Sequence, residues 1–343
     1  MFPSDIFIYQ DKAYVTARSK LTIIDIHDPS IPIIIGSIYT PYGAQGMIVK
    51  NNIAYIACDT SLQIIDVNTS SLQYSGFNSF DKIFASDVEV VNDIAYVASS
   101  INGFNIVDIS TPTYYTISCI KDIQVDGITI SGTKAYVLDQ NSIKVIDIEN
   151  VNQPTIIGSA YCYGQKDGIV ISENKAYVAA GYNGGLQIFD ISNPRRPRAV
   201  GSLNADSEKY GTKIVGNIAY MADGENGLKI FDVTTPSTPT LLSSIDTPGY
   251  AKKVYIENSF VYVSDSVAGV QIIDISNIYN PEIVSSVNTG WAESVIIDQN
   301  IAYVAAGDKG LVIFNVYDPL HPFAIGSFDT SGFAYDLTIV DNI

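Results

Sequence analysis

The chain has 343 residues, and its 36 Asp and Glu residues against 19 Lys and Arg residues give a formal net charge of −17. This acidity excludes nucleic acid and anionic lipid as expected partners, because both require a basic face that displaces their counterions. The sequence contains no apolar run of 18 residues, and Met1–Ser4 has neither the basic nor the apolar part of a signal peptide. We therefore expect no membrane insertion within this chain.

A short sequence motif recurs along the chain, in which an apolar run ends at an acidic residue. Examples are LTIIDIHDPSIP, GLQIFDISNPRRP and GLKIFDVTTPSTP. The acids are Asp25, Asp66, Asp108, Asp147, Asp190, Asp232 and Asp274, with Asn315 in the eighth place, and successive members are 39 to 43 residues apart. A tyrosine column lies about 11 residues earlier and consists of Tyr14, Tyr55, Tyr96, Tyr136, Tyr177, Tyr220, Tyr262 and Tyr303. Two columns in register indicate an internal repeat.

Each unit contains four short runs with strand-like alternation, separated by Asn, Asp, Gly or Pro. We name these runs strands A, B, C and D in the order in which they occur within a unit. Strand A is exemplified by TKIVGN at 212–217, and strands B, C and D of the preceding unit are AYVA at 176–179, LQIFD at 186–190 and PRAVGSL at 197–203. No unit has a helical apolar pattern. Four strands in about 42 residues are typical of a propeller blade. The sequence thus predicts an all-β fold: a β-propeller of eight four-stranded antiparallel blades.

We expect a single domain over residues 1–343. Its units span approximately 2–42, 43–83, 84–124, 125–164, 165–207, 208–249, 250–291 and 292–332, with a ninth partial unit at 333–343. The repeat supplies one A strand more than eight blades need, because SDIFIYQ begins at residue 4 and AYDLTIVDN begins at residue 334. We predict that Asp5 to Tyr9 form the innermost strand of blade 1, and that the C-terminal segment lies near the seam between blades 8 and 1.

The repeated acid has a structural explanation. A carboxylate at the end of strand C can accept hydrogen bonds from backbone N–H groups of the turn to strand D. Eleven of the 14 prolines fall in this connection, where they preset the turn. The seven acids are therefore interpreted as turn residues. Looser turns are expected in unit 2, which has no proline there, in unit 3, which has one, and at Asn315.

The segments GLQIFDISNPRRPRAVGS and NIAYVAAGDKGLVIF resemble the LVIVD repeat, which forms propellers and looks similar to the YVTN-type surface-protein propellers. The resemblance covers essentially the whole chain. It implies an extracellular or cell-surface location, since such repeats occur mainly in exported or surface proteins. It implies no catalytic motif and no cofactor.

Residues that break the repeat on the D-to-A and B-to-C loops are the candidates for function. They are Tyr210, Tyr250, Lys252, Lys253, Trp291, Glu293, Phe333 and Tyr335, with Asp126 and Asp167 on earlier units. The aromatic members either pack between blades or rim the channel mouth. In the second case Tyr210, Tyr250, Trp291, Phe333 and Tyr335 would contact a protein or glycan partner, or another copy of the chain.

The favoured function is a non-catalytic scaffold that binds a partner or assembles. The alternative is a propeller enzyme, a hydrolase or lyase, with its site at the channel mouth. No metal site is expected, because only His27 and His321 are available and the glycine-rich loops lack the spacing of a calcium loop. Cys58, Cys119 and Cys162 form no C-x-x-C pair and are expected to be buried or semi-buried residues without a redox role. Arg195, Arg196 and Arg198 share one turn, either solvated or a docking point for an acidic neighbour.

Overall fold

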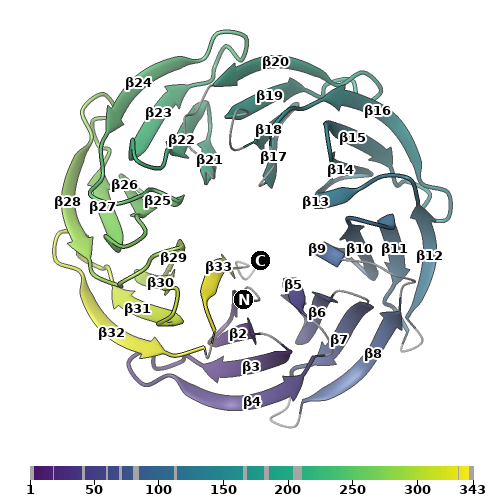
Figure 1. Ribbon diagram of the computed structural model, residues 1–343, viewed down its shortest axis with the longest axis horizontal. Coiled ribbons are helices and arrows are strands. Elements are labelled where there is room, and N and C mark those ends of the chain that lie inside the picture. Colours follow the sequence, from purple (N-terminus) through teal and green to yellow (C-terminus); the bar gives the residue numbers. More distant parts are fainter. Residues whose placement is uncertain are drawn as a thin grey trace.

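The computed structural model describes residues 4–17, 19–40, 43–58, 61–68, 72–79, 85–111, 114–164, 168–180, 185–203, 211–330 and 332–339. Eight sheets stand around a central channel like the blades of a propeller, as Figure 1 shows. The predicted eight-bladed all-β fold is confirmed. None of the described residues forms a helix that could span a membrane.

The strands follow the predicted order from the channel outwards. Blades 1 and 2 contain β1 (Ser4–Tyr9), β2 (Lys12–Ala17), β3 (Lys20–Asp25), β4 (Ile33–Tyr39), β5 (Ala44–Lys50), β6 (Ile53–Cys58), β7 (Ser61–Asp66) and β8 (Gln73–Ser79). Blades 3 and 4 contain β9 (Ala85–Val91), β10 (Ile94–Ser99), β11 (Gly103–Asp108), β12 (Tyr115–Ile120), β13 (Val125–Ser131), β14 (Lys134–Asp139), β15 (Ser142–Asp147) and β16 (Thr155–Tyr161).

Blades 5 to 8 repeat the same arrangement. Blades 5 and 6 contain β17 (Gly168–Ser172), β18 (Lys175–Ala179), β19 (Leu186–Asp190), β20 (Arg198–Leu203), β21 (Thr212–Val215), β22 (Ile218–Ala222), β23 (Leu228–Asp232) and β24 (Thr240–Ile245). Blades 7 and 8 contain β25 (Lys253–Glu257), β26 (Phe260–Ser264), β27 (Val270–Asp274), β28 (Glu282–Val287), β29 (Ser294–Asp298), β30 (Ile301–Ala305), β31 (Leu311–Asn315) and β32 (Phe323–Phe328). The last strand is β33 (Ala334–Ile339).

Blade 1 differs from the other seven. Its sheet has five strands in the order β33-β1-β2-β3-β4, and β33 runs parallel to β1. Residues Asp5–Tyr9 pair with β2 as expected. The prediction that they are the innermost strand is wrong, because β33 adds to their free inner edge. An inner edge strand offers unpaired backbone groups, and a parallel strand can bind there without displacing the first.

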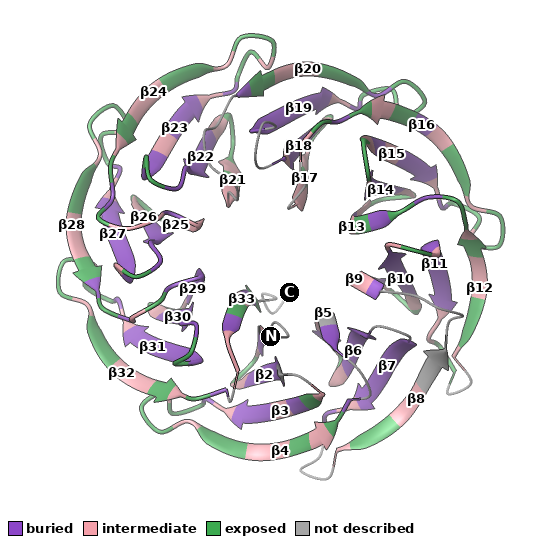
Figure 2. Ribbon diagram, viewed as in Figure 1, coloured by how far each residue is buried: buried purple, intermediate pink, exposed green. Residues whose placement is uncertain are grey.

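The core is divided into eight clusters, each between two neighbouring blades. Figure 2 shows that the B and C strands are mostly buried, whereas the outer D strands and the turns at the rim are largely exposed. Each repeated tyrosine is buried in one of these clusters, and burial raises the pKa of Tyr14, Tyr55, Tyr262 and Tyr303 to about 12. Since one cluster joins blades 8 and 1, the ring closes with the same kind of packing that joins the other blades.

The turn between strands C and D has the same hydrogen bond in every blade. The side chain that ends strand C accepts a bond of 2.7 to 3.1 Å from the backbone N–H two residues later, in all seven acids and in Asn315. Asn315 is thus no looser than the acids in this contact. The proline-poor turns of units 2 and 3 lie partly outside the described residues. In unit 5, bonds from Ser192 and then from Arg198 lower the pKa of Asp190 to about 2.

These turns also connect neighbouring blades, which the sequence reasoning missed. At six junctions in the described part of the chain, a small residue in the middle of strand D lies against the next blade's turn. Serines donate to its carbonyl groups, from Ser118 to Val151, Ser243 to Ile278 and Ser285 to Pro319, at 2.5 to 2.6 Å. At the other three junctions a glycine leaves room for a carbonyl oxygen of the turn where a Cβ would overlap it. These pairs are Gly158 with Pro194, Gly201 with Pro236 and Gly326 with Pro29. The last contact joins blades 8 and 1.

Candidate functional site

The B-to-C turns and D-to-A loops lie on one face of the disc and are joined across blade junctions. Isolated antiparallel bridges connect Gly224 with Ala251, Ser266 with Ala292, and Gly307 with Ala334. Each bridge ties the turn of one blade to the lead-in of the next A strand. The residue just before each alanine is one of the predicted aromatics, Tyr250, Trp291 or Phe333.

Three of the predicted aromatic residues form one cluster at the junction of blades 8 and 1. The ring centroids of Trp291 and Phe333 are 6.1 Å apart in an edge-to-face arrangement. Those of Phe333 and Tyr335 are 4.5 Å apart. Gly307 lies beneath the cluster with a φ of +55°, and a Cβ at this position would lie 3.0 Å from the Phe333 ring and from the Cβ of Trp291. We call Trp291, Phe333 and Tyr335 the aromatic cluster.

Charged side chains hold Trp291 in place. Its indole N–H donates to Oε1 of Glu293. The ammonium of Lys252 lies 2.5 Å from the same oxygen and 5.2 Å from the centroid of the indole ring, within cation–π range. Glu293 is itself buried. These contacts restrict the orientation of the indole ring.

The aromatic cluster is packed against the protein on one side and exposed to solvent on the other. One side packs on the blade 8 turn, while Trp291 is 41% exposed and Tyr335 is 39% exposed. Tyr250 occupies the matching position one junction earlier and is partly exposed. Tyr210 and Asp167 lie outside the described residues.

A second feature is a cavity of about 530 Å³ on the channel side of blades 1 to 5. Its described lining carries five carboxyl groups and no Lys, Arg or His. The acids are Asp5, Asp87, Glu89, Asp126 and Asp336. Only Asp126 belongs to the residues proposed from the sequence. The signal for Asp87 and Glu89 was present as alternate acids in the inner strand ASDVEVV.

Two of these acids bind backbone groups of the neighbouring blade. Oδ2 of Asp87 accepts from the N–H of Ile128 at 3.1 Å, and Oε2 of Glu89 accepts from the N–H of Ile130 at 3.1 Å. Burial raises the pKa of both carboxyls, that of Glu89 to about 7. Inner strands have a free edge, and these side chains supply acceptors to it.

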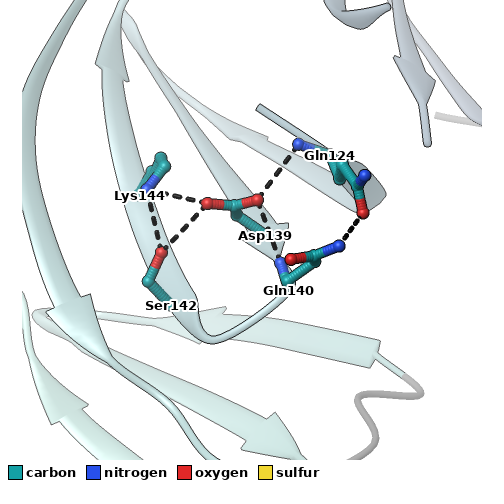
Figure 3. A network of polar contacts seen from close by, with 5 residues as sticks. All are labelled: Gln124, Asp139, Gln140, Ser142 and Lys144. Carbon is teal, nitrogen blue, oxygen red and sulfur yellow. Dashed lines mark hydrogen bonds and ion pairs between the residues drawn. The ribbon is translucent and has the colours of Figure 1, made fainter. Parts of the chain in front are cut away.

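The loop face of blade 4 carries a polar network, drawn in Figure 3. Oδ2 of Asp139 lies 2.8 Å from the ammonium of Lys144, and Oδ1 accepts from the N–H of Gln124 at 3.0 Å. Burial raises the pKa of Asp139, but bonds from Lys144, Gln124 and Gln140 outweigh it and lower the pKa overall. The network fastens the lead-in of blade 4 to its own B-to-C turn.

The remaining polar candidates occupy separate places. His27 lies 3.3 Å from Asp11 and His321 lies 2.8 Å from Asp318. No group of three metal-ligating side chains occurs among the described residues. None of the three cysteines forms a disulfide bond. Cys58 and Cys162 are buried as expected, whereas Cys119 is exposed, because it lies on an outer strand.

The fold and its repeated turns define an eight-bladed β-propeller with an aromatic cluster on its loop face and an acidic cavity on its channel side. The LVIVD repeat model matches residues 3–40, 43–76, 84–121, 124–161, 163–205, 211–247, 248–289 and 290–330. The chain therefore belongs to the family of LVIVD-repeat proteins.

Similar solved structures share the fold at low sequence identity. The computationally designed Ika8 protein is 14% identical with a TM-score of 0.67, covering 88% of this chain and 91% of its own. BamB from Moraxella catarrhalis is 13% identical with a TM-score of 0.65, covering 88% and 90%. A chain of the mitotic checkpoint complex is 13% identical with a TM-score of 0.59, covering 80% and 87%. A search of curated protein sequences finds no match to this chain.

Proposed function

We propose that this propeller is a non-catalytic binding module, and that a protein partner contacts the loop face at the aromatic cluster. The observation that carries the proposal is the cluster itself, in which Trp291 and Tyr335 remain 41% and 39% exposed although both are large aromatic residues. Tryptophan and tyrosine are the residue types that most often dominate binding energy at protein interfaces.

The contacts around Trp291 support this role. Glu293 and Lys252 hold the indole from its polar edge and its face, so its orientation is set in the free protein. A pre-oriented side chain loses less conformational freedom when a partner binds. One structurally similar propeller is a chain of the mitotic checkpoint complex, so the fold serves as a subunit of at least one assembly.

A hydrolase or lyase at the channel mouth is the second candidate, favoured by the acidic cavity. Glu89, whose pKa burial raises to about 7, would suit general acid–base chemistry. Its carboxylate already accepts a hydrogen bond from the N–H of Ile130, and the carboxylate of Asp87 accepts one from the N–H of Ile128. Because these carboxylates already accept hydrogen bonds from backbone N–H groups, we favour a binding function over a catalytic one. A catalytic activity lost in Glu89→Gln and retained in Trp291→Ala would support the enzyme instead.

We also propose that the module acts at the cell surface or outside the cell. The proposal rests on the LVIVD resemblance, because such repeats occur mainly in exported or surface proteins.

The binding proposal is tested by placing a photoreactive amino acid at position 335 and, as a matched control, at position 317. Tyr317 is 79% exposed on a C-to-D turn of the opposite face. When the variants are expressed in cells of the source organism, we expect position 335 to give a discrete cross-linked species and position 317 to give none. The species from position 335 should disappear when Trp291→Ala is also present. The same species from both positions, or none from position 335, would refute the proposal.

A further inference from the structure

The first and last strands lie side by side along the channel. In the parallel pair of β1 and β33, Asp5 lies opposite Asp336 and Ile6 lies opposite Leu337. Paired residues of adjacent strands direct their side chains to the same face of the sheet. Ile6 and Leu337 therefore enter the core between blades 8 and 1, whereas the two carboxyl groups both line the acidic cavity.

Charge around this carboxyl pair is unbalanced. The ammonium of Lys253, on β25, lies 2.5 Å from Oδ1 of Asp336. Asp87 on β9 adds a third carboxyl group near Asp5. The charged groups that act on Asp5 are thus Asp336 from β33, Lys253 from β25 and Asp87 from β9. Counting Asp5 itself, one cation faces three acids. Oδ1 of Asp5 is shielded from solvent and has no hydrogen-bond partner among the described residues.

We propose that the β1–β33 pair is a pH-sensitive clasp, which holds the last strand in the ring while the Asp5 carboxyl is protonated and loosens it when Asp5 ionises. A neutral carboxyl beside the Asp336 carboxylate leaves Lys253 with one partner. An ionised Asp5 places a second negative charge next to Asp336, so that Lys253 faces two carboxylates, and the described lining of the cavity adds no Lys, Arg or His. Repulsion between neighbouring buried carboxylates then acts directly across the strand pair.

The titration of Asp5 supports this inference. Burial first, and the Asp336 carboxylate second, raise the pKa of Asp5 from 3.8 to about 8, although Lys253 and the N–H of Ile6 act in the opposite direction. The folded protein therefore retains a proton that the unfolded chain releases above its ordinary pKa. Stability from this site declines as the pH rises from about 4 to about 8, and the ionised state of the clasp is reached above that range.

The expected change is local. Ala334 remains bound to Gly307 by two backbone hydrogen bonds of 3.0 and 3.3 Å, so the start of β33 stays on blade 8. Loosening affects the strand from Asp336 onwards. Trp291 is the only tryptophan in the chain and contacts Phe333, whose ring packs against Tyr335, the residue directly before Asp336. Its fluorescence therefore reports on the clasp.

The test measures Trp291 fluorescence and amide hydrogen exchange of residues 334–339 between pH 6 and 9.5, with exchange rates corrected for their intrinsic pH dependence. We expect both signals to change together with a midpoint near pH 8 in the wild type. Asp5→Asn, which resembles the protonated form, should remove the transition and keep the protected state at high pH. A wild type without a transition, or an Asp5→Asn variant with the wild-type midpoint, would overturn the proposal.

Asp336→Asn provides a second route if Asp5→Asn does not fold. Removing the Asp336 charge eliminates one cause of the raised Asp5 pKa and leaves Lys253 free to favour the ionised form. The midpoint should then move to lower pH. An unchanged or higher midpoint in Asp336→Asn would show that the two carboxyls do not interact across the strands.

Discussion

The outer ring of C-to-D turns repeats the same contacts from blade to blade, whereas the inner ring of A strands does not. Every C-to-D turn repeats the same hydrogen bond, and the small residues of strand D receive the next blade's turn at six described junctions. The inner strands differ from blade to blade, with acids on β9, a lysine on β25 and an added parallel strand in blade 1. The regular ring maintains the scaffold, and the irregular ring and the loops above it are where function is to be sought.

The largest effect is expected where the irregular ring contributes to the core. Leu337 on β33 is buried between blades 8 and 1, and Leu337→Ala should reduce the free energy of unfolding by about 2–4 kcal/mol. Urea denaturation measures this, with the exposed neighbour Thr338→Ala as the control. Equal stability of the two variants would mean that β33 is not part of the folded ring.

The regular ring can be disrupted at Gly201. A side chain here would overlap the carbonyl oxygen of Pro236 in the turn of blade 6. Gly201→Val should cost about 1–3 kcal/mol of stability by overpacking. Gly201→Ser should cost less, because Ser243 and Ser285 donate to the turn from the same place in their blades. If serine and valine were equally destabilising, the account of the small-residue column would be wrong.

The inner acids should give the stability a pH dependence that the outer acids do not share. The pKa of Glu89 rises from 4.5 to about 7 in the folded protein, so its contribution to stability falls as the pH increases through that interval. Glu89→Gln should make this decline shallower and add on the order of 1 kcal/mol at pH 7.5, after allowance for solvent screening. Thermal melts across pH measure it, and the exposed Glu257→Gln serves as the control. A slope unaffected by Glu89→Gln would contradict the burial explanation.

The smallest effect is expected for a single turn acid. Asp232 is half-buried and accepts a hydrogen bond from the backbone N–H of Thr234 at 2.7 Å. Asp232→Ala should lower the melting temperature by about 1–2 °C, and Asn315→Asp should change it little, since Asn315 already makes the same bond. Because bonds from Thr234 lower the pKa of Asp232, its contribution should vanish as the pH falls below about 4. An effect of Asp232→Ala that persists at pH 2 would refute the hydrogen-bond explanation.

The same contrast explains what the sequence could predict. Strand order, blade number and the turn acids follow from columns that recur eight times, and each copy supports the others. The surplus strand could not be placed, because its parallel pairing with β1 depends on a free edge that exists only once the ring is formed. The cavity acids Asp5 and Asp336 come from opposite ends of the chain, so no local pattern connects them. The small-residue column of strand D was visible, but its meaning depends on a contact with the next blade.

Hydrogen exchange on the complex with the cross-linked partner tests the central claim most directly. If the irregular loop face is the binding surface, binding should increase protection at residues 251–252, 291–293, 307–309 and 333–335, and leave the C-to-D turns at 26–32 and 316–322 unchanged. Trp291→Ala should weaken the complex while its unfolding transition stays close to that of the wild type. Protection confined to the C-to-D turns or the outer strands would contradict the account.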